Sequence, residues 1–494
     1  MRKSKSSGLL LHITALPSDY GIGDLGKAAY RFVDFLKKSR QKFWQVLPVN
    51  ETFSGSPYNC ISSFAGNTLL INTDALLKRK LLKKKISAPG WLKDSERVNF
   101  KKVYKFKEAI FKKAFKNFKP DRSFRVFLKE NSFWLDDYSD FVVLKKRFKK
   151  IWINWPVKFR DRDEIAIKEF RERFSDEILF QKFKQWLFYS QWFSLKDYAN
   201  KRGIKIIGDI PIFLSFDSAD VWAHRKLFLL NKKGLPLFVS GVPPDYFSRT
   251  GQRWGNPIYN WKEMRKSNFL WWQMRFRHCL KLYDMIRIDH FRGFCAYWRI
   301  PAKNKTALAG KWIKAPGIEL FKTLKKKLGS LPVIAEDLGY IPPTVRNFRK
   351  KLGFPGMKVL HFAFSKNRKN IHLPDNFDKN SVVYTGTHDN DTTAGWWRTL
   401  PKRQKERVKK YLAENKIEFS EKQINWNLIE LAMKSRAFLS IFPVQDILGL
   451  SSKARFNRPG SGRGNWRWKL KDFSLLFKQA QRLKELTQKY CRNA

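Results

Sequence analysis

Cysteine is scarce in this 494-residue chain, and the four cysteines that it has lie far apart. Cys60, Cys279, Cys295 and Cys491 form no C-x-x-C pair. Their spacing argues against a disulfide framework and against a zinc site. Proteins without disulfides are typical of reducing compartments, so we expect a cytoplasmic location.

Long hydrophobic runs are also missing. No apolar run reaches the ~18 residues that a membrane-spanning helix needs. Residues 1–21 begin with basic residues and continue with an apolar stretch, which imitates a signal peptide. However, His12 and Thr14 interrupt the stretch, and no small-residue cleavage site follows. A short tail leading into a first strand is the better interpretation.

Acidic residues are few: 43 Asp and Glu stand against 100 Lys and Arg, which gives a formal net charge of +57. Such a charge favours contact with polyanions, including nucleic acid and anionic membranes. A specific nucleic-acid binder normally combines a basic patch with a recognisable reading module. The basic residues here are spread along the whole chain, and no such module is visible. We therefore expect non-specific polyanion binding, with no specific nucleic acid and no membrane as partner.

A regular series of short apolar runs predicts eight strands, and these runs are nearly continuous rather than alternating, as in parallel strands buried on both faces. Segments with helical periodicity lie between several of them, at 24–39, 262–281, 317–328 and 342–352. The series predicts an α/β fold, a (β/α)8 TIM barrel. A doubly wound open sheet is the alternative, but no glycine-rich phosphate turn follows these strands. The predicted strands are 8–14, 43–49, 205–213, 284–291, 331–339, 357–364, 381–390 and 437–448.

We expect a single catalytic barrel over residues 1–494, with two insertions between barrel strands. The first, about 60–203, is rich in Lys, Phe and Trp with helical periodicity, which predicts a largely helical subdomain packed on the barrel. The second, about 214–262, contains "SGVPPDYFSRTGQRWGNPIYNW", which is full of turn formers and aromatic residues. It is interpreted as an active-site loop region.

Polar residues occur where several of the predicted strands end, and in a TIM barrel the C-terminal end carries the active site. A single aspartate at a strand end is more often a helix cap. Several acidic and imidazole groups from four strands are harder to explain in this way, because like charges in one cleft destabilise a fold unless their perturbed pKa values are used. The residues concerned are Asp209, Arg287, Asp289, Glu336, His388 and Asp389.

Two carboxyl groups in such a cleft suit glycoside cleavage, in which one carboxylate attacks the anomeric carbon and a protonated one protonates the leaving oxygen. Arg287 precedes Asp289 by two residues and points to the same side of the strand, where it is expected to keep Asp289 ionised. Glu336 lies in the apolar stretch "VIAEDL", where desolvation would raise its pKa. Asp389 and His388 would then hold the ring hydroxyls of the sugar.

A metal site is the alternative interpretation, since Asp289, His290, His388 and Asp389 could in principle bind a divalent cation. Arg287 would repel that cation, and no H-x-x-x-H or comparable helical pair occurs. Spacing alone specifies no coordination geometry. We expect no metal.

An ordered set of motifs gives the chain a resemblance to a known family. "GLLLHITALPSDYGIGDLG", "SPYNCISSFAGNTLLI", "GDIPIFLSFDSADVW", "GVPPDYFSRTGQRWGNPIY", "RIDHFRG", "AEDLG", "FPGMKVLHFAF", "THDNDTTAGWW" and "NRPGSGRGNWRWKL" follow one another. In this order they resemble the 4-α-glucanotransferase family (amylomaltase, disproportionating enzyme), glycoside hydrolase family 77. The resemblance covers nearly the whole chain. It implies a (β/α)8 barrel with helical insertions, no metal, no organic cofactor, and α-1,4-glucans such as maltooligosaccharides, starch or glycogen as substrates.

The resemblance also implies roles for individual residues. Asp289 would be the nucleophile, Glu336 the general acid/base and Asp389 the transition-state stabiliser. The residues that fall on substrate-binding positions are Tyr58, Asp209, Asp245, Trp254, Arg287, His388 and Asn457.

Transfer, rather than hydrolysis, follows from the resemblance alone, because the strand-end carboxyls by themselves indicate only retaining α-glucosidase chemistry. Transfer requires that an acceptor sugar outcompetes water, and the aromatic loop 243–259 is the candidate for excluding water. Two alternatives stay open: an intracellular α-glucan hydrolase of the same clan, and a non-enzymatic polyanion-binding protein built on a barrel.

Overall fold

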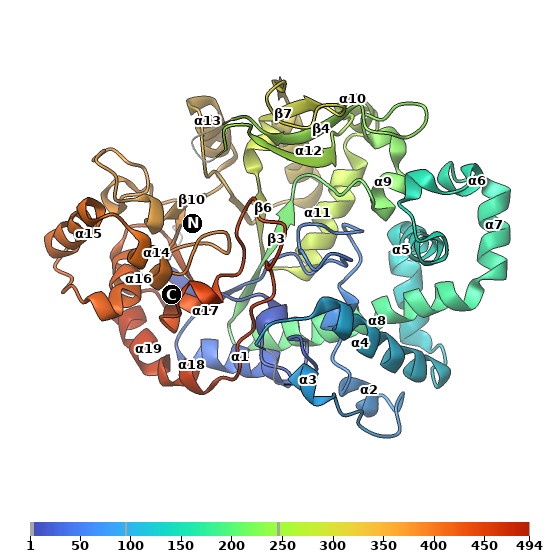
Figure 1. The fold of residues 1–494 in the computed structure, drawn as a ribbon, viewed down its shortest axis with the longest axis horizontal. Helices are drawn as coiled ribbons and strands as arrows, with labels where there is room; N and C mark the ends of the chain where they lie inside the picture. The colour runs from blue at the N-terminus through green and yellow to red at the C-terminus, as the bar shows by residue number, and fades with distance from the viewer. Residues whose placement is uncertain (1–3, 94–95, 245–247, 494) are drawn as a thin grey trace.

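Eight parallel strands close into a barrel in the computed structural model, which describes residues 4–93, 96–244 and 248–493 (Figure 1). The order around the barrel is β1-β12-β11-β10-β9-β6-β3-β2, and β2 pairs with β1 to close it. Each predicted strand matches one barrel strand, so the predicted TIM barrel is confirmed. The barrel strands are β1 (Ser6–Leu10), β2 (Phe43–Gln45), β3 (Lys205–Pro211), β6 (Met285–Asp289), β9 (Val333–Ala335), β10 (Gly356–Val359), β11 (Ser381–Tyr384) and β12 (Leu439–Pro443).

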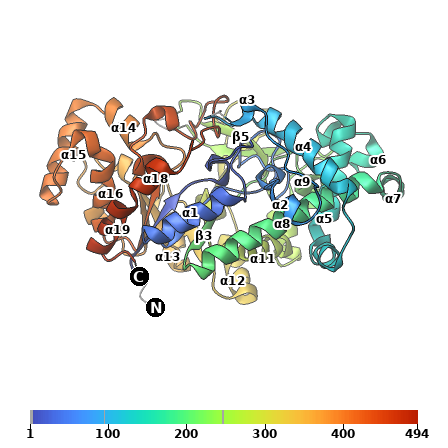
Figure 2. The ribbon, with the colours of Figure 1, turned by 90° about the horizontal axis from the view of Figure 1, so that it is seen from below.

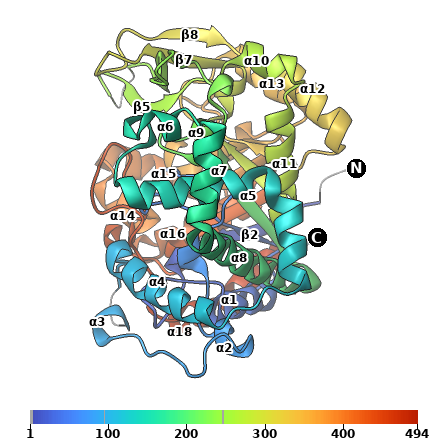
Figure 3. The same ribbon diagram turned by 90° about the vertical axis from the view of Figure 1, so that its right-hand side faces the viewer.

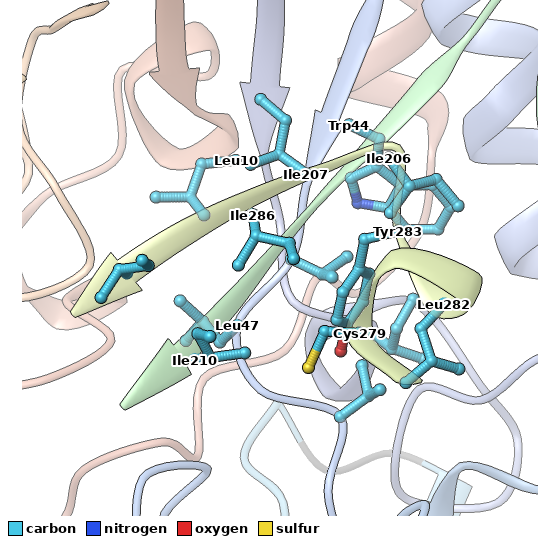
Figure 4. Close-up of a cluster of buried hydrophobic side chains, with 14 of the residues drawn as sticks. Leu10, Trp44, Leu47, Ile206, Ile207, Ile210, Cys279, Leu282, Tyr283 and Ile286 are labelled. Carbon is cyan, nitrogen blue, oxygen red and sulfur yellow. The ribbon is translucent and has the colours of Figure 1, made fainter. Parts of the chain in front are cut away.

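The core of the barrel consists of the apolar side chains that made these strands recognisable. Figure 4 shows Leu10 of β1, Ile207 of β3 and Ile286 of β6 together with Cys279 and other side chains of the surrounding layer. Ile207 and Ile286 are fully buried, and Leu10 is nearly so. Full burial of one such side chain stabilises the fold by about 1.5–3 kcal/mol, so the near-continuous apolar runs account for the strands' position inside the molecule.

Helices surround the barrel, and those predicted at 24–39, 317–328 and 342–352 are found as α1, α12 and α13. The helix predicted at 262–281 is two helices, because Asn268 and Phe269 adopt left-handed backbone conformations, with φ of 50° and 58°, that end the first one. The helices of this layer are α1 (Lys27–Lys38), α10 (Trp261–Lys266), α11 (Leu270–Leu282), α12 (Gly317–Leu328), α13 (Pro343–Leu352), α14 (Thr393–Thr399), α15 (Lys402–Glu414), α16 (Ile424–Lys434), α17 (Val444–Ile447), α18 (Ser474–Lys478) and α19 (Ala480–Lys489).

The long connection between β2 and β3 is helical. Its α5 packs along α8, and α8 also contacts α1 and β3, which ties the connection to the barrel. In Figure 1, α5, α6 and α7 lie at the opposite end of the molecule from α14, α15 and α16; Figure 2 gives the same arrangement from below. The helices are α2 (Ala75–Lys78), α3 (Gly90–Lys93), α4 (Phe100–Lys116), α5 (Arg122–Phe148), α6 (Val157–Arg160), α7 (Glu164–Arg173) and α8 (Ser175–Lys201).

A second sheet, which the sequence did not predict, accompanies the barrel. Its order is β5-β4-β7-β8, and its strands are antiparallel. Two of these strands, with α9 (Ala219–Ala223), lie in the segment that was expected to be a loop. Figure 3 shows β5, β7 and β8 together at the top of the molecule. The strands are β4 (Phe238–Val242), β5 (Gln252–Pro257), β7 (Ala296–Pro301) and β8 (Lys311–Lys314).

Membrane-spanning helices are not found in the described part of the chain: none of its helices combines the necessary length and apolar character.

Arg492, close to the C-terminus, is completely buried. Its guanidinium donates hydrogen bonds of 2.7 Å to the backbone carbonyls of Met433, Ser435 and Ala437. It also reaches the carbonyl of Ser6, in the first barrel strand, at 3.4 Å. One side chain thus joins the end of the chain to the turn between α16 and β12.

We expect Arg492→Ala to lower the free energy of unfolding by about 2–4 kcal/mol, since it leaves buried carbonyls unpaired. Urea unfolding of the full chain measures the change. Lys471→Ala, which removes an equal charge from an exposed position, is the control and should unfold like the unmodified protein. An Arg492→Ala variant as stable as that control would contradict this account of the C-terminus.

Candidate active site

The register of the barrel places Asp289 and Glu336 side by side. β6 and β9 are parallel neighbours with Ile288 opposite Ala335, and the backbone N–H of Glu336 donates to the carbonyl of Ile288 at 3.0 Å. Asp289 is the residue after Ile288, and Glu336 is the residue after Ala335. Because parallel strands end at the same edge of a barrel, both side chains stand at the C-terminal edge, where barrel enzymes carry their active sites.

Arg287 connects two of the carboxylates. Its Nη1 donates to both oxygens of Asp209, at 2.8 and 2.7 Å, and its Nη2 lies 3.1 Å from Oδ1 of Asp289. The side chains of Arg287 and Asp209 are almost fully buried, whereas 31% of the Asp289 side chain is exposed. Asp209 therefore fixes the guanidinium, and the guanidinium orients the more accessible Asp289.

A second chain of contacts begins at Tyr58. Its hydroxyl donates to Oδ2 of Asp209 at 2.7 Å and lies 2.8 Å from Nε2 of His388, with the two rings stacked. Nε2 of His388 is also 3.3 Å from Oδ2 of Asp389. Burial lowers the pKa of His388, with Asp389 opposing, so the ring is neutral. Because the Tyr58 hydroxyl donates its hydrogen bond to Asp209, its oxygen is free to accept one from His388. The proton of the neutral His388 ring is therefore assigned to Nε2.

Two backbone N–H groups hold the carboxyl of Glu336. His290 donates to Oε2 at 2.7 Å, and Leu338 donates to Oε1 at 2.8 Å. Burial raises the pKa of Glu336, and Arg287 and these two donors oppose the rise. The sequence analysis expected this rise in pKa from the apolar stretch "VIAEDL" around Glu336. His290 has a left-handed backbone with φ of 51°, which is uncommon for a residue other than glycine and occurs often at functional sites.

The charge of Asp289 differs from the expectation. Arg287 was expected to keep Asp289 ionised, but burial outweighs the ion pair and raises the pKa of Asp289 to about 8, with Asp209 and Glu336 adding to the rise. Because Asp289 and Glu336 are neighbours with raised pKa values, they titrate as a pair rather than independently.

Asp389 is held from the other side of the cleft. Nδ2 of Asn457 donates to its Oδ1 at 2.6 Å. Arg455 donates to the backbone carbonyls of both Asp389, at 2.8 Å, and Asn457, at 2.7 Å. The structure thus places Asn457, a predicted substrate-binding residue, against Asp389, and adds Arg455, which the sequence analysis did not select. Its position two residues before Asn457 was the only available signal.

Trp466 is a second residue that the sequence analysis missed. Its ring lies 5.7 Å from that of Tyr58 and 6.0 Å from that of His388, centroid to centroid. It belongs to "NRPGSGRGNWRWKL", the motif that contains Asn457. The motif therefore contributes both a polar and an aromatic side chain to the site.

Trp254 reaches the cleft from β5. Trp254 is 39% exposed, and its ring meets the ring of His290, the residue after Asp289, edge to face with the centroids 4.8 Å apart. This contact places the second sheet at the C-terminal end of the barrel. Asp245, the remaining predicted substrate-binding residue, lies outside the described residues.

Metal ligands are not gathered in the described ranges: no group of three or more His, Cys, Asp or Glu is arranged to hold an ion. The carboxyls instead have protein donors, with Asp209 and Asp289 on Arg287 and Asp389 on Asn457. Incubation with EDTA is therefore expected to leave unchanged the activity that the family resemblance implies, measured as glucose released from maltotriose. A loss of activity that added Ca²⁺ or Mg²⁺ restores would contradict this prediction.

Enzymes that cleave glycosidic bonds with a carboxyl pair often place that pair at the C-terminal edge of a barrel, and this chain shares the arrangement. A model of the glycoside hydrolase 77 family, described as 4-alpha-glucanotransferase, matches residues 11–475. The chain belongs to this family.

Full-length relatives agree. The 4-alpha-glucanotransferase of Clostridium butyricum is 45% identical over 489 residues, which cover 98% of this chain and 100% of the relative. That of Thermus thermophilus is 45% identical, with 99% of each chain covered. The amylomaltase from Streptococcus agalactiae, solved in complex with acarbose, is 40% identical with a TM-score of 0.94, covering 99% of this chain and 100% of that one. This chain is an enzyme of the 4-alpha-glucanotransferase class.

Proposed function

We propose that the chain transfers a segment of an α-1,4-glucan to the 4-hydroxyl of an acceptor glucan or glucose by a retaining double displacement. Maltooligosaccharides and starch-type or glycogen-type glucans are the proposed substrates. The observation that carries the mechanism is the placement of Asp289 beside Glu336 on neighbouring strands, with Arg287 bound to Asp289. The acarbose complex of the Streptococcus agalactiae relative adds support.

In the first displacement the ionised Asp289 attacks C1 of the donor glucan. Glu336 gives its proton to the glycosidic oxygen of the departing chain, and a glucosyl ester with Asp289 remains. Asp289 must carry the negative charge and Glu336 the proton. The guanidinium 3.1 Å from Asp289 stabilises the charged form of Asp289 and so opposes the rise in pKa that burial causes.

In the second displacement Glu336 accepts the proton of an acceptor's 4-hydroxyl, whose oxygen attacks C1 and releases Asp289. Two inversions keep the α configuration. The two N–H groups that fix Glu336 keep its carboxyl in one place for both proton transfers.

The other carboxylate and its partners bind the sugar that reacts. Asp389 stabilises the oxocarbenium-like transition state through the ring hydroxyls, and Asn457 orients it. Tyr58, Asp209 and His388 form one hydrogen-bonded wall of the same subsite. Fixed dipoles aimed at developing charge are the usual source of such stabilisation.

Transfer requires that the ester meets a sugar before it meets water. Trp254 and, from the family resemblance, Asp245 are proposed to bind the acceptor and exclude water. Incubation with pure maltotriose, followed by chromatography, tests the function: glucose together with a ladder of longer maltooligosaccharides is expected. Shorter sugars alone would mean hydrolysis and would remove the proposal.

The dependence of kcat/KM on pH is expected to be bell-shaped. Activity is lost at low pH when Asp289 becomes protonated and at high pH when Glu336 loses its proton. Because burial raises the pKa of both carboxyl groups, both limbs are expected at higher pH than for exposed carboxyl groups. Initial rates with maltotriose between pH 3 and about 10 measure both limbs. An acid limb at or below the ordinary aspartate value would contradict the raised pKa values.

The organisation and surroundings of the enzyme are proposed as follows. Residues 1–494 act as one catalytic unit, with residues 60–203 and 214–262 as its insertions. A cytoplasmic location is supported by the four cysteines, all of them unpaired in the structure. The net charge of +57 supports non-specific polyanion binding without a specific nucleic acid or a membrane; retention on heparin that moderate salt abolishes would test it.

A further inference from the structure

Tyr340 is the most exposed large hydrophobic side chain of the described residues, with 78% of its surface open to solvent. It lies in the loop between β9 and α13, four residues after Glu336. Single exposed aromatic residues are common and need no explanation by themselves. The backbone and the side chains beneath Tyr340 distinguish it.

The backbone of this loop is fixed at both ends. Leu338 donates its N–H to Glu336 at 2.8 Å, and Nη1 of Arg292 donates to the carbonyl of Tyr340. Between them Gly339 takes a left-handed conformation, with φ of 82°, that other residues rarely adopt. The exposed ring of Tyr340 is therefore carried by a backbone segment that hydrogen bonds hold in place.

Arg292 also joins the loop to the second sheet. Its guanidinium carbon lies 3.5 Å from the centroid of the Trp312 ring, on β8, and 5.7 Å from that of Tyr340. Only 8% of Arg292 is exposed. Trp312 in turn packs edge-on against Trp298 of β7, with ring centroids 5.2 Å apart. We call Trp312, Arg292 and Tyr340 the aromatic ledge.

The ledge lies close in the chain to both Asp289 and Glu336. Arg292 follows Asp289 by three residues, and the loop of Tyr340 leaves directly from Glu336. The acid/base must contact the oxygen that joins the donor sugar to the leaving chain, and the acceptor's 4-hydroxyl takes the same place in the second step. A glucan that extends from this oxygen would therefore lead past the segments after β6 and β9, which carry Arg292 and Tyr340.

We propose that the aromatic ledge is a binding site for the acceptor glucan, in which the Tyr340 ring stacks on a glucose unit beyond the one that carries the reacting hydroxyl. The inference rests on the proposed function and adds to it a preference for acceptor length. A ring on a fixed backbone loses little conformational entropy when a ligand binds. Acceptors of several sugars gain this contact, whereas glucose is too short to reach it.

Transfer from α-maltotriosyl fluoride to a series of acceptors, from glucose to maltotetraose, measures the contribution. For full-length Tyr340→Ala the acceptor KM for maltotetraose is expected to rise about three- to tenfold, with the KM for glucose unchanged. Tyr340→Phe keeps the ring and should behave like the unmodified enzyme. Phe193→Ala, which removes an exposed ring from α8, is the control and should leave all values unchanged.

The outcomes separate the ledge from the enzyme's activity. An unmodified protein that transfers to no acceptor would contradict the proposed function. If Tyr340→Ala had the same KM as the unmodified enzyme for every acceptor, the ledge alone would be overturned. An equal rise in KM for all acceptors, glucose included, would also overturn it. Light scattering that showed a dimer lost in Tyr340→Ala would assign the ring to contact between two copies of the chain and would also overturn the proposal.

Discussion

Asp289→Asn abolishes transfer, with kcat expected to fall by on the order of 10⁴ or more, because an amide cannot form the glucosyl ester. The fold should survive. Arg287 loses one partner but keeps both hydrogen bonds to Asp209, so no buried charge is left unpaired. Maltotriose turnover and thermal unfolding, measured on the same preparation, separate the loss of chemistry from a loss of structure.

The matched control is Asp284→Asn. Asp284 directly precedes β6, at the opposite end of the strand from Asp289, and accepts a hydrogen bond from the backbone of Ile206. Its replacement should change stability slightly and leave the chemical step unchanged. Near-normal activity of Asp289→Asn would contradict the assignment of the nucleophile.

Glu336→Gln is expected to lower kcat on maltotriose by about 10²–10⁴, the usual contribution of a general acid/base. Glutamine keeps the shape of the side chain but has no proton to give to the leaving oxygen. A donor whose leaving group needs no proton should avoid the first part of the defect. Formation of the ester from α-maltotriosyl fluoride should therefore survive in Glu336→Gln and fail in Asp289→Asn.

The comparison of donors distinguishes the two carboxyls. If Glu336→Gln lost activity equally with maltotriose and with the fluoride, Glu336 would not be the acid of the first step. The pH profile gives an independent check, since the alkaline limb should disappear in this variant. If the alkaline limb stayed in place in Glu336→Gln, a group other than Glu336 would be responsible for it.

The barrel was predictable because its strands are buried on both faces. Runs such as 205–213 and 284–291 are apolar on both sides, and this pattern marks strands without knowledge of their neighbours. Each predicted strand ran past the C-terminal end of the observed one, as at 8–14 against Ser6–Leu10. The apolar character continues there into the loops that line the cleft.

The second sheet was not predictable for the opposite reason. β4 pairs with β7, so that Phe238 stands opposite Pro301, and a local pattern contains no information about partners so far apart. β5 carries glycine and proline in "QRWGNP", residues that predict turns. Tertiary pairing overrode these local preferences.

The candidate catalytic residues could be selected from the sequence, but the pKa shifts of their carboxyl groups could not be predicted. The sequence placed Arg287 beside Asp289, and the structure confirms the contact. Whether the arginine or burial decides the pKa of Asp289 depends on how deeply the cleft encloses it, which spacing does not reveal. The N–H groups of His290 and Leu338 that hold Glu336 are also invisible in a sequence, since every residue except proline has one.

A covalent glucosyl ester on Asp289 is the central claim, and trapping it is the most direct test. Glu336→Gln would be incubated with α-maltotriosyl fluoride, and its intact mass and proteolytic peptides measured by mass spectrometry. We predict that the protein is heavier by one maltotriosyl group, which is attached to the peptide that contains Asp289. The double variant Asp289→Asn/Glu336→Gln should carry no such group. No adduct, or an adduct on another residue, would contradict the account.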